Sequence, residues 1–175
     1  AYFHRSYWYY RLVHQFGDVP LVLEEVQEPR LDFNTYSREA ILKQIKKDME
    51  FSVQWLPQDV EPGKENRAAG YHLLTKIYLS LREFDNAVEA ASQAIDNSSY
   101  ALMTDRFGSG PYVDNPDFNV LWDLHQKENI SSSDNTEMIL ASQDQIDTEG
   151  NRGAGRRPLP RQPDQEQRWA PHPEG

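Results

Sequence analysis

The sequence contains no cysteine, and it has no apolar run approaching the roughly 20 residues of a membrane-spanning helix. The first absence excludes a disulfide, a thiolate nucleophile and a cysteine-ligated metal. No signal peptide can be recognised either. However, the chain opens with Ala1, without an initiator Met and already inside a helical pattern, so we interpret it as a piece of a longer protein. The missing export signal is then uninformative.

Positive charge is scarce in this chain. Its 18 lysines and arginines are outnumbered by 28 aspartates and glutamates, which gives a net charge of -10. Nucleic-acid binding needs a basic face for the phosphates, so the composition argues against that class of function. An acidic, well-solvated surface suits neutral or cationic partners. With 175 residues, the chain is long enough for one domain with a hydrophobic core.

Sequence patterns typical of catalysis are absent or incomplete. Ser133-Asp134-Asn135 resembles one motif of the serine β-lactamases, but the accompanying Ser-x-x-Lys and Lys-Thr-Gly motifs do not occur. The five histidines include no His-x-x-x-His pair that would place two zinc ligands on one helix face. There is no glycine-rich phosphate loop, and no carboxylate pair lies in a context suited to glycoside hydrolysis. The sequence therefore predicts no enzyme and no cofactor.

An oxygen-rich cluster of aspartates and asparagines occupies residues 114–119 and has the side chains that calcium prefers. Counting from Asn115, however, Val120 replaces the glycine of position six and Gln126 replaces the glutamate of position twelve. Turn chemistry around Pro116 explains the cluster better. We therefore predict no metal site.

The most distinctive segment that is present lies at the start of the chain. Six of the nine residues 2–10 are aromatic, and apolar residues continue at roughly helical spacing to Val13. This pattern predicts a helix packed between neighbours, with its aromatic side chains in the core. Gly17 permits a left-handed helix end and Pro20 prevents continuation, so the short run 21–23 should be extended.

A second helix is predicted between Ser37, a suitable N-cap, and Pro57, which ends it. Lysines and glutamates cover one face, and the opposite face should enter the core. The apolar residues of that face recur at steps of three and four residues: Ile41, Leu42, Ile45, Met49, Val53 and Leu56.

The following segment has the strongest repeat pattern in the chain. Its spacing is that of a tetratricopeptide helix pair, although Thr75 replaces the usual glycine and the closing proline is missing. Small residues should let the two helices lie close together. We therefore predict an all-α fold built as a tetratricopeptide-like helical repeat scaffold. The pattern residues are Leu74, Tyr78, Phe84, Ala87 and Ala94, and the predicted packing stripe is Ala87, Val88, Ala91, Ala94 and Ile95.

These segments resemble the SusD/RagB family of glycan-capturing outer-membrane lipoproteins of Gram-negative bacteria. The string Phe16-Gly17-Asp18-Val19-Pro20-Leu21, directly after an aromatic helix, is similar to the family's own motif. One departure is Glu65-Asn66-Arg67, which replaces the family's usual residues before the double alanine. Further similar strings are Asp48-Met49, Leu56-Pro57, Ala68-Ala69, Lys76-Ile77-Tyr78-Leu79, Tyr100-Ala101-Leu102 and Asn135-Thr136-Glu137-Met138-Ile139, so that the resemblance covers about residues 1–145.

The resemblance implies a function and a set of partners. SusD-like proteins hold a glycan or other nutrient at the cell surface and deliver it to a TonB-dependent, SusC-like β-barrel transporter in the outer membrane. Their lipid-bearing cysteine is expected before Ala1 and is not in this chain. An alternative is a soluble tetratricopeptide-like interaction scaffold that grips a peptide in its concave groove. A polysaccharide-cleaving enzyme would need carboxylates that we cannot identify.

Composition divides the chain near residue 150. Residues 1–150 form the predicted SusD-like helical domain, incomplete as it stands. The tail 151–175 contains five of the eleven prolines and five arginines but none of the six lysines, and it has no periodic pattern. We expect this tail to be disordered. A sharper hypothesis is a shift of reading frame near residue 150.

Ligand contacts, if they lie in this part of the chain, should come from the loop 107–123. An aromatic platform flanked by polar side chains suits the flat apolar faces and hydroxyl groups of a sugar. The alternative reading is that Phe118, Leu121 and Trp122 anchor the loop in the core. The residues predicted to contact the ligand are Tyr112, Asn115, Asp117 and Trp122.

Overall fold

The protein is described by a computed structural model covering residues 1–29, 31–61, 63–96, 99–109 and 115–141. The predicted boundary at residue 150 and the tail 151–175 lie outside the described residues. Helices dominate the described part, as predicted. Two strands of two residues each lie between the first two helices and pair with each other. The elements are α1 (Tyr2–Phe16), β1 (Val19–Pro20), β2 (Thr35–Tyr36), α2 (Arg38–Trp55), α3 (Arg67–Leu81), α4 (Phe84–Asp96) and α5 (Val120–Leu124).

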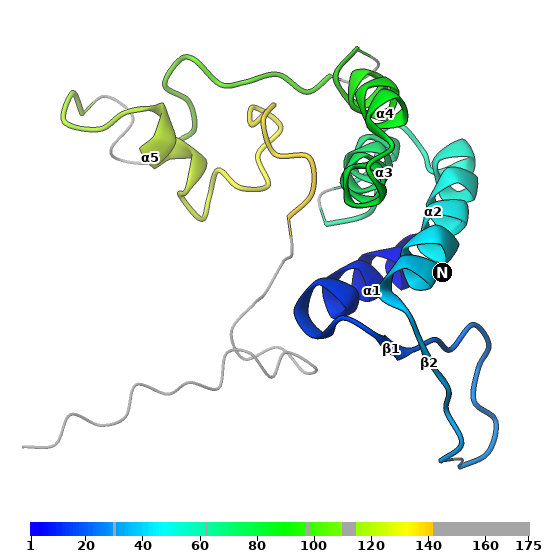
Figure 1. Cartoon of the computed structure of the whole chain (residues 1–175). Helices are drawn as coiled ribbons and strands as arrows, with labels where there is room; N and C mark the ends of the chain where they lie inside the picture. The colour runs from blue at the N-terminus through cyan, green and yellow to red at the C-terminus, as the bar shows by residue number, and fades with distance from the viewer. Residues whose placement is uncertain (30, 62, 97–98, 110–114, 142–175) are drawn as a thin grey trace, which may run out of the picture. The chain divides into compact units, whose positions relative to one another are not determined.

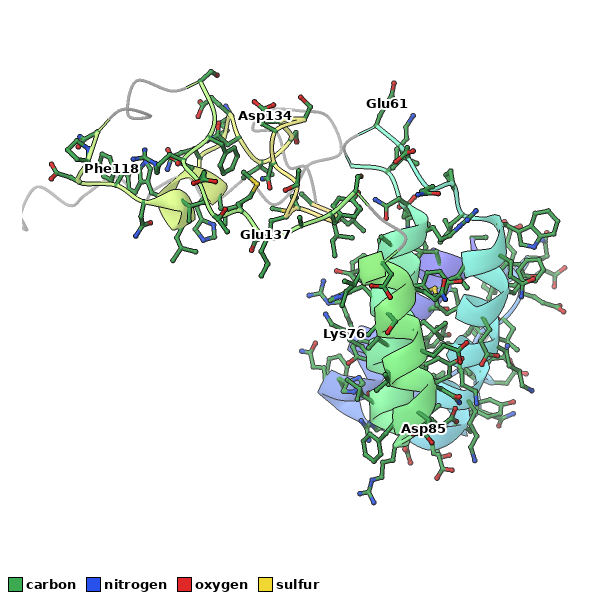
Figure 2. All side chains as sticks on the ribbon, turned by 90° about the horizontal axis from the view of Figure 1, so that it is seen from above. Glu61, Lys76, Asp85, Phe118, Asp134 and Glu137 are labelled. Atoms are coloured by element: carbon green, nitrogen blue, oxygen red, sulfur yellow. The ribbon has the colours of Figure 1, made fainter. Side chains whose placement is uncertain are left out.

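The helices α1 to α4 pack mainly on their neighbours in chain order, α1 on α2, α2 on α3 and α3 on α4 (Figure 1). This arrangement is typical of helical repeats, in which each element covers the next. The fully buried apolar side chains at its centre come from α1, α2 and α3. They are Val13, Ile41, Leu42, Ile45, Met49 and Ile77. Charged side chains such as Lys76 and Asp85 lie on the outside (Figure 2).

Helix α1 ends at Gly17, whose φ of 76° is open to glycine at little cost and whose N–H donates to the carbonyl of Val13. The strand that follows is β1, which pairs with β2 in antiparallel register, Val19 with Tyr36 and Pro20 with Thr35. The extended run was expected at 21–23, so the strand lies earlier in the chain than predicted. Pro20 fits at this place because a two-stranded pair consists of edge strands.

The aromatic side chains of α1 are divided between core and surface. Phe3 is buried, whereas Tyr2, Trp8 and Phe16 are 46%, 56% and 63% exposed. The prediction that the aromatic residues of 2–10 belong to the core is therefore right for Phe3 and wrong for Tyr2 and Trp8. The reason is that α1 packs almost entirely on one partner, α2, so its opposite face stays open in this chain.

Helix α2 begins as predicted. The hydroxyl oxygen of Ser37 accepts a hydrogen bond from the N–H of Ala40 at 3.3 Å, and the helix ends before Pro57. Its one buried charged side chain among the described residues, Asp48, accepts two hydrogen bonds from Arg5 of α1 at 2.7 and 2.8 Å. This bidentate pair ties α1 to α2 alongside their apolar contacts.

The pair α3 and α4 confirms the predicted tetratricopeptide-like unit. Small residues mediate the close approach, since Ala87 and Ala90 of α4 are buried. The predicted stripe is wrong for Val88 and Ile95, which are 68% and 70% exposed. The buried side of α4 is therefore centred on Ala87 and Ala90, only part of a turn from the stripe that we assigned, because the helix packs mainly on α3 and buries a narrow alanine face.

Candidate functional site

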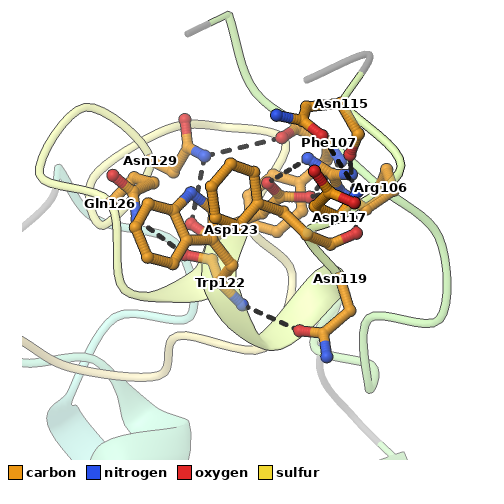
Figure 3. A network of polar contacts seen from close by, with 10 residues as sticks. Arg106, Phe107, Asn115, Asp117, Asn119, Trp122, Asp123, Gln126 and Asn129 are labelled. Carbon is orange, nitrogen blue, oxygen red and sulfur yellow. Dashed lines mark hydrogen bonds and ion pairs between the residues drawn. The ribbon is translucent and has the colours of Figure 1, made fainter. Parts of the chain in front are cut away.

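The loop predicted to contact ligand is organised around one ion pair, between Arg106 and Asp123. The guanidinium donates through Nε and Nη2 to the two carboxylate oxygens, at 2.5 and 3.0 Å (Figure 3). The side chain of Asp123 is 3% exposed and that of Arg106 is 24% exposed. Such a fork-to-fork pair has a defined geometry, so it places Arg106 accurately against α5.

The same arginine holds the loop that precedes α5. Its Nη1 donates to the carbonyl oxygens of Asn115 and Phe118, at 2.8 and 2.9 Å. The side chain of Arg106 therefore connects Asn115, Phe118 and, through Asp123, the helix α5. Since loops owe their shape to such side-chain contacts rather than to a backbone ladder, Arg106 determines the conformation of residues 115–118.

The carboxylate and carbonyl of Asp123 have further donors. The backbone N–H of Phe107 donates to its carboxylate at 3.2 Å, and Asn129 Nδ2 donates to its carbonyl at 3.0 Å (Figure 3). The hydrogen bonds from Arg106, together with that from Phe107, hold the pKa of Asp123 below its ordinary value of 3.8. Asp123 is therefore ionised across the physiological pH range, and it serves as an acceptor that holds the loop.

Two aromatic rings lie over this network. The rings of Phe118 and Trp122 are stacked, with centroids 4.2 Å apart and planes inclined by 20°. Trp122 is 39% exposed. We refer to this pair as the aromatic platform. The backbone N–H of Trp122 donates to Asn119 Oδ1 at 3.2 Å. Asn119 is thus the N-cap of the short helix that carries the ring.

The predicted ligand residues can now be placed. Asn115, Asp117 and Trp122 belong to one continuous loop and helix start, and Asn115 Oδ1 accepts from the N–H of Asp117 at 2.9 Å. Tyr112 lies outside the described residues. That any of these four contacts a ligand stays a prediction. The alternative, in which Leu121 anchors the loop in the core, is wrong for that residue because it is 61% exposed.

Within the residues that the structure describes, the side chains of the oxygen-rich cluster form a turn and a helix cap. Asn115 closes a turn onto Asp117, and Asn119 caps α5, as set out above. Within the described ranges there is no group of three or more metal-ligating side chains. No described helix combines the length and apolar character that crossing a membrane requires.

Sequence reasoning missed the arginine and aspartate that organise the site. Arg106 and Asp123 lie 17 positions apart on a loop and a short helix, so no helical or strand periodicity relates them. Their separate signals are weak, since arginines and aspartates are common in loops. Only the folded loop shows that one guanidinium donates both to the carboxylate of Asp123 and to the carbonyls of Asn115 and Phe118.

Comparison with known proteins identifies the class of fold. A SusD-like protein of known structure from Bacteroides fragilis superposes with a TM-score of 0.66 at 19% identity, covering 86% of this chain and 27% of that protein. A solved laminarin-binding SusD-like protein superposes with a TM-score of 0.55 at 23% identity, covering 60% of this chain and 25% of the other. The helical scaffold described above is therefore that of SusD-like proteins.

Sequence comparison leads to the family itself. Residues 1–79 match the model of a SusD-like family whose description is starch-binding associating with outer membrane. SusD-like protein P2 of Formosa agariphila is 30% identical over 134 residues, which is 72% of this chain and 24% of that protein. The chain belongs to the SusD-like family, and it spans about a quarter of the length of this curated relative.

Proposed function

We propose that the protein binds a glycan or related nutrient at the outer surface of the cell and performs no chemistry on it. The observation that carries this proposal is the match of residues 1–79 to a family described as starch-binding and associating with the outer membrane. The laminarin-binding protein of the same fold adds support, since its ligand is also a polysaccharide.

The aromatic platform is the part of the described chain best suited to contact the sugar. A pyranose ring has an apolar face that packs on an aromatic ring, and hydroxyl groups at its rim that need polar partners. Phe118 and Trp122 supply the stacked rings. Asn115 and Asp117 lie in the adjoining turn and supply an amide and a carboxylate. Arg106 and Asp123 hold the loop in shape before ligand arrives, which reduces the entropy lost on binding.

Delivery to a transporter is the second part of the proposal. We infer that the helical scaffold faces a TonB-dependent, SusC-like β-barrel and that the loops hold the nutrient. Helix α4 supports this division, because its Val88 and Ile95 are 68% and 70% exposed. Exposed branched apolar residues on a rigid helix are suited to a protein partner. Co-purification of the barrel with the intact protein, lost on Val88→Glu/Ile95→Glu, would support the partnership.

Affinity electrophoresis in gels containing starch or laminarin tests the binding proposal. The unmodified chain should be retarded by at least one of the two polysaccharides. Trp122→Ala should weaken the retardation about tenfold, since it removes one of the two stacked rings. Trp55→Ala is the matched control, because Trp55 is 74% exposed on α2, and it should migrate like the unmodified chain.

Two results would contradict the proposal. Equal loss of retardation in both tryptophan variants would show that the platform has no specific role. A chain that no polysaccharide retards, but that captures a defined peptide selectively, would instead support the interaction-scaffold alternative.

A further inference from the structure

A polar pocket of about 600 Å³ lies where four parts of the chain meet. Its walls come from the loop after α2, the first turns of α3, the last turn of α4 and residues 99–100. None of its lining residues belongs to the aromatic platform. Ligand pockets generally have volumes of about 300–1,000 Å³, so this one has room for a small molecule or one end of a longer one.

The side chains of this pocket combine flat rings with hydrogen-bonding groups. Tyr71 and Tyr100 contribute two partly exposed aromatic rings, one from α3 and one from the segment after α4. Gln93 of α4 and Arg67 of α3 also line the pocket. Rings for stacking, with amide and guanidinium groups at their edges, are the set of partners that a polyhydroxylated ring requires.

Hydrogen bonds within the protein hold the walls of the pocket. Asn66 Nδ2 donates to the hydroxyl oxygen of Tyr100 at 2.6 Å, while Asn66 Oδ1 caps α3 by accepting from the N–H of Ala69 at 2.8 Å. Arg67 Nε donates to the carbonyl of Leu56 at 3.0 Å, which fixes its side chain against the preceding loop. These contacts within the protein fix the positions of Tyr100 and Arg67, which reduces the entropy lost when a ligand binds between the walls.

The charge of the pocket restricts its ligand. Asp59 and Asp96 bring two carboxylates, and Arg67 brings one guanidinium that already donates to a carbonyl. The whole chain adds a net charge of -10. An anionic sugar would meet like charges in a confined space, which costs binding free energy. An uncharged sugar meets acceptors for its hydroxyl groups.

We propose that this pocket is a second carbohydrate site, which binds an uncharged sugar unit by stacking it on Tyr71 and Tyr100. The proposal rests on the glycan-binding function proposed above and adds a site with its own selectivity. A long glycan that occupies both sites on one chain gains from the high effective concentration of its second contact. Isolated hexasaccharides then bind weakly at each site and polysaccharides bind more tightly.

The test is a titration of the full chain with maltohexaose and laminarihexaose, in which two NMR signals are monitored. The methyl group of Ala68, which lines the pocket, reports on the second site, and the indole N–H of Trp122 reports on the platform. Uncharged hexasaccharide should shift both signals. An oligogalacturonate of equal length should leave the Ala68 signal unmoved and should shift it in Asp59→Asn/Asp96→Asn.

Variants assign the Ala68 response to the pocket. Tyr71→Ala should weaken that response roughly three- to tenfold, whereas Tyr71→Phe, which keeps the ring, should retain it. Gln93→Ala should weaken it too. Gln54→Ala is the matched control, since Gln54 Nε2 donates to the carbonyl of Glu50 and Gln54 does not line the pocket. Thermal melts of all variants verify that each one folds.

The outcomes separate this inference from the function on which it rests. Shifts at Trp122 with none at Ala68, and unchanged binding by Tyr71→Ala, would overturn the second site and leave glycan binding intact. Shifts at neither reporter with any oligosaccharide or polysaccharide would overturn both. Equal binding of the oligogalacturonate at Ala68 would overturn the proposed selectivity for uncharged sugars.

Discussion

At the scale of single residues, two arginine–aspartate pairs have the same design. Asp48 and Asp123 are both buried, and each accepts two hydrogen bonds from an arginine distant in the chain, Arg5 and Arg106. A buried carboxylate without its partner is strongly destabilising, although a complete pair adds little net stability over an apolar one. The pairs therefore determine which conformation is adopted more than how stable it is.

Replacing Arg106 should show this effect. Arg106→Gln leaves the carboxylate of Asp123 buried without its charge partner, and it removes the donors to Asn115 and Phe118. We expect the loop to lose about 3 kcal/mol of local stability. Amide hydrogen exchange of Phe107, which donates to Asp123, measures the loss directly. Arg82→Gln, at an exposed position, is the control and should leave the Phe107 exchange rate unchanged.

The same carboxylate predicts a dependence on pH. Because the folded-state pKa of Asp123 is lowered from 3.8, its contribution to stability is complete above that value and is lost as pH falls through the lower folded-state pKa. The indole signal of Trp122 should thus be constant from pH 7 to about 4 and should change below it. Asp123→Asn should abolish the transition. A midpoint above pH 5 in the unmodified chain would contradict the assignment.

At the scale of elements, the N-cap residues of the helices differ in how many other segments of the chain they bond to. Ser37 caps α2 locally, through the N–H of Ala40. Asn66 caps α3 and also donates to the hydroxyl of Tyr100 and to the carbonyl of Ile139, at 2.6 and 3.1 Å. One asparagine therefore joins the helical scaffold to segments 34 and 73 positions away. Asn66 belongs to the string Glu65-Asn66-Arg67, at which the sequence departs from the family's usual residues. Its role as a cap was not predicted.

This difference should appear in the cost of truncation. Ser37→Ala removes a cap and should lower the free energy of unfolding by about 1 kcal/mol. Asn66→Ala removes a cap together with the hydrogen bonds to Tyr100 and Ile139, so we expect about 2–4 kcal/mol. Urea denaturation followed by circular dichroism compares the two. Equal losses would mean that the contacts to residues 100 and 139 contribute nothing to stability.

Element by element, the sequence predicts what depends on local periodicity. The N-cap of α2, its apolar face and the α3–α4 pair follow from spacing and are confirmed. Trp8 of α1 and Val88 of α4 were predicted to be packed, and both are exposed. Apolar residues indicate that a face is available for burial, but how much of it is covered depends on how many neighbours the helix has.

At the scale of the whole molecule, the described chain leaves large apolar side chains uncovered. The largest fractions on the helices are those of Trp55, Ile95 and Val88, at 74%, 70% and 68%. Repeat scaffolds need neighbouring elements to cover each outer face. The 175-residue chain should accordingly be marginally stable on its own, and its charge of -10 should keep it in solution.

Thermal melting tests this prediction. We expect a midpoint below about 45 °C, at the low end for mesophilic domains. Trp55→Ser should change the free energy of unfolding by less than about 0.5 kcal/mol, because the ring is largely exposed. Ile77→Ala, at a position with 0% exposure, should cost about 2–5 kcal/mol. Cooperative melting of the unmodified chain at high temperature would contradict the prediction.

The sequence by itself determined the class of this protein and most of its helices. Aromatic density before Phe16-Gly17-Asp18, apolar periodicity and small residues are local properties, and they act within a few turns of backbone. Only the tertiary structure decided which residues form the sites. Arg106 meets Asp123, and Tyr71 lines a pocket with Tyr100, because the folded chain brings separate segments together. Such contacts depend on long-range packing, for which the spacing of residues along the chain carries no signal.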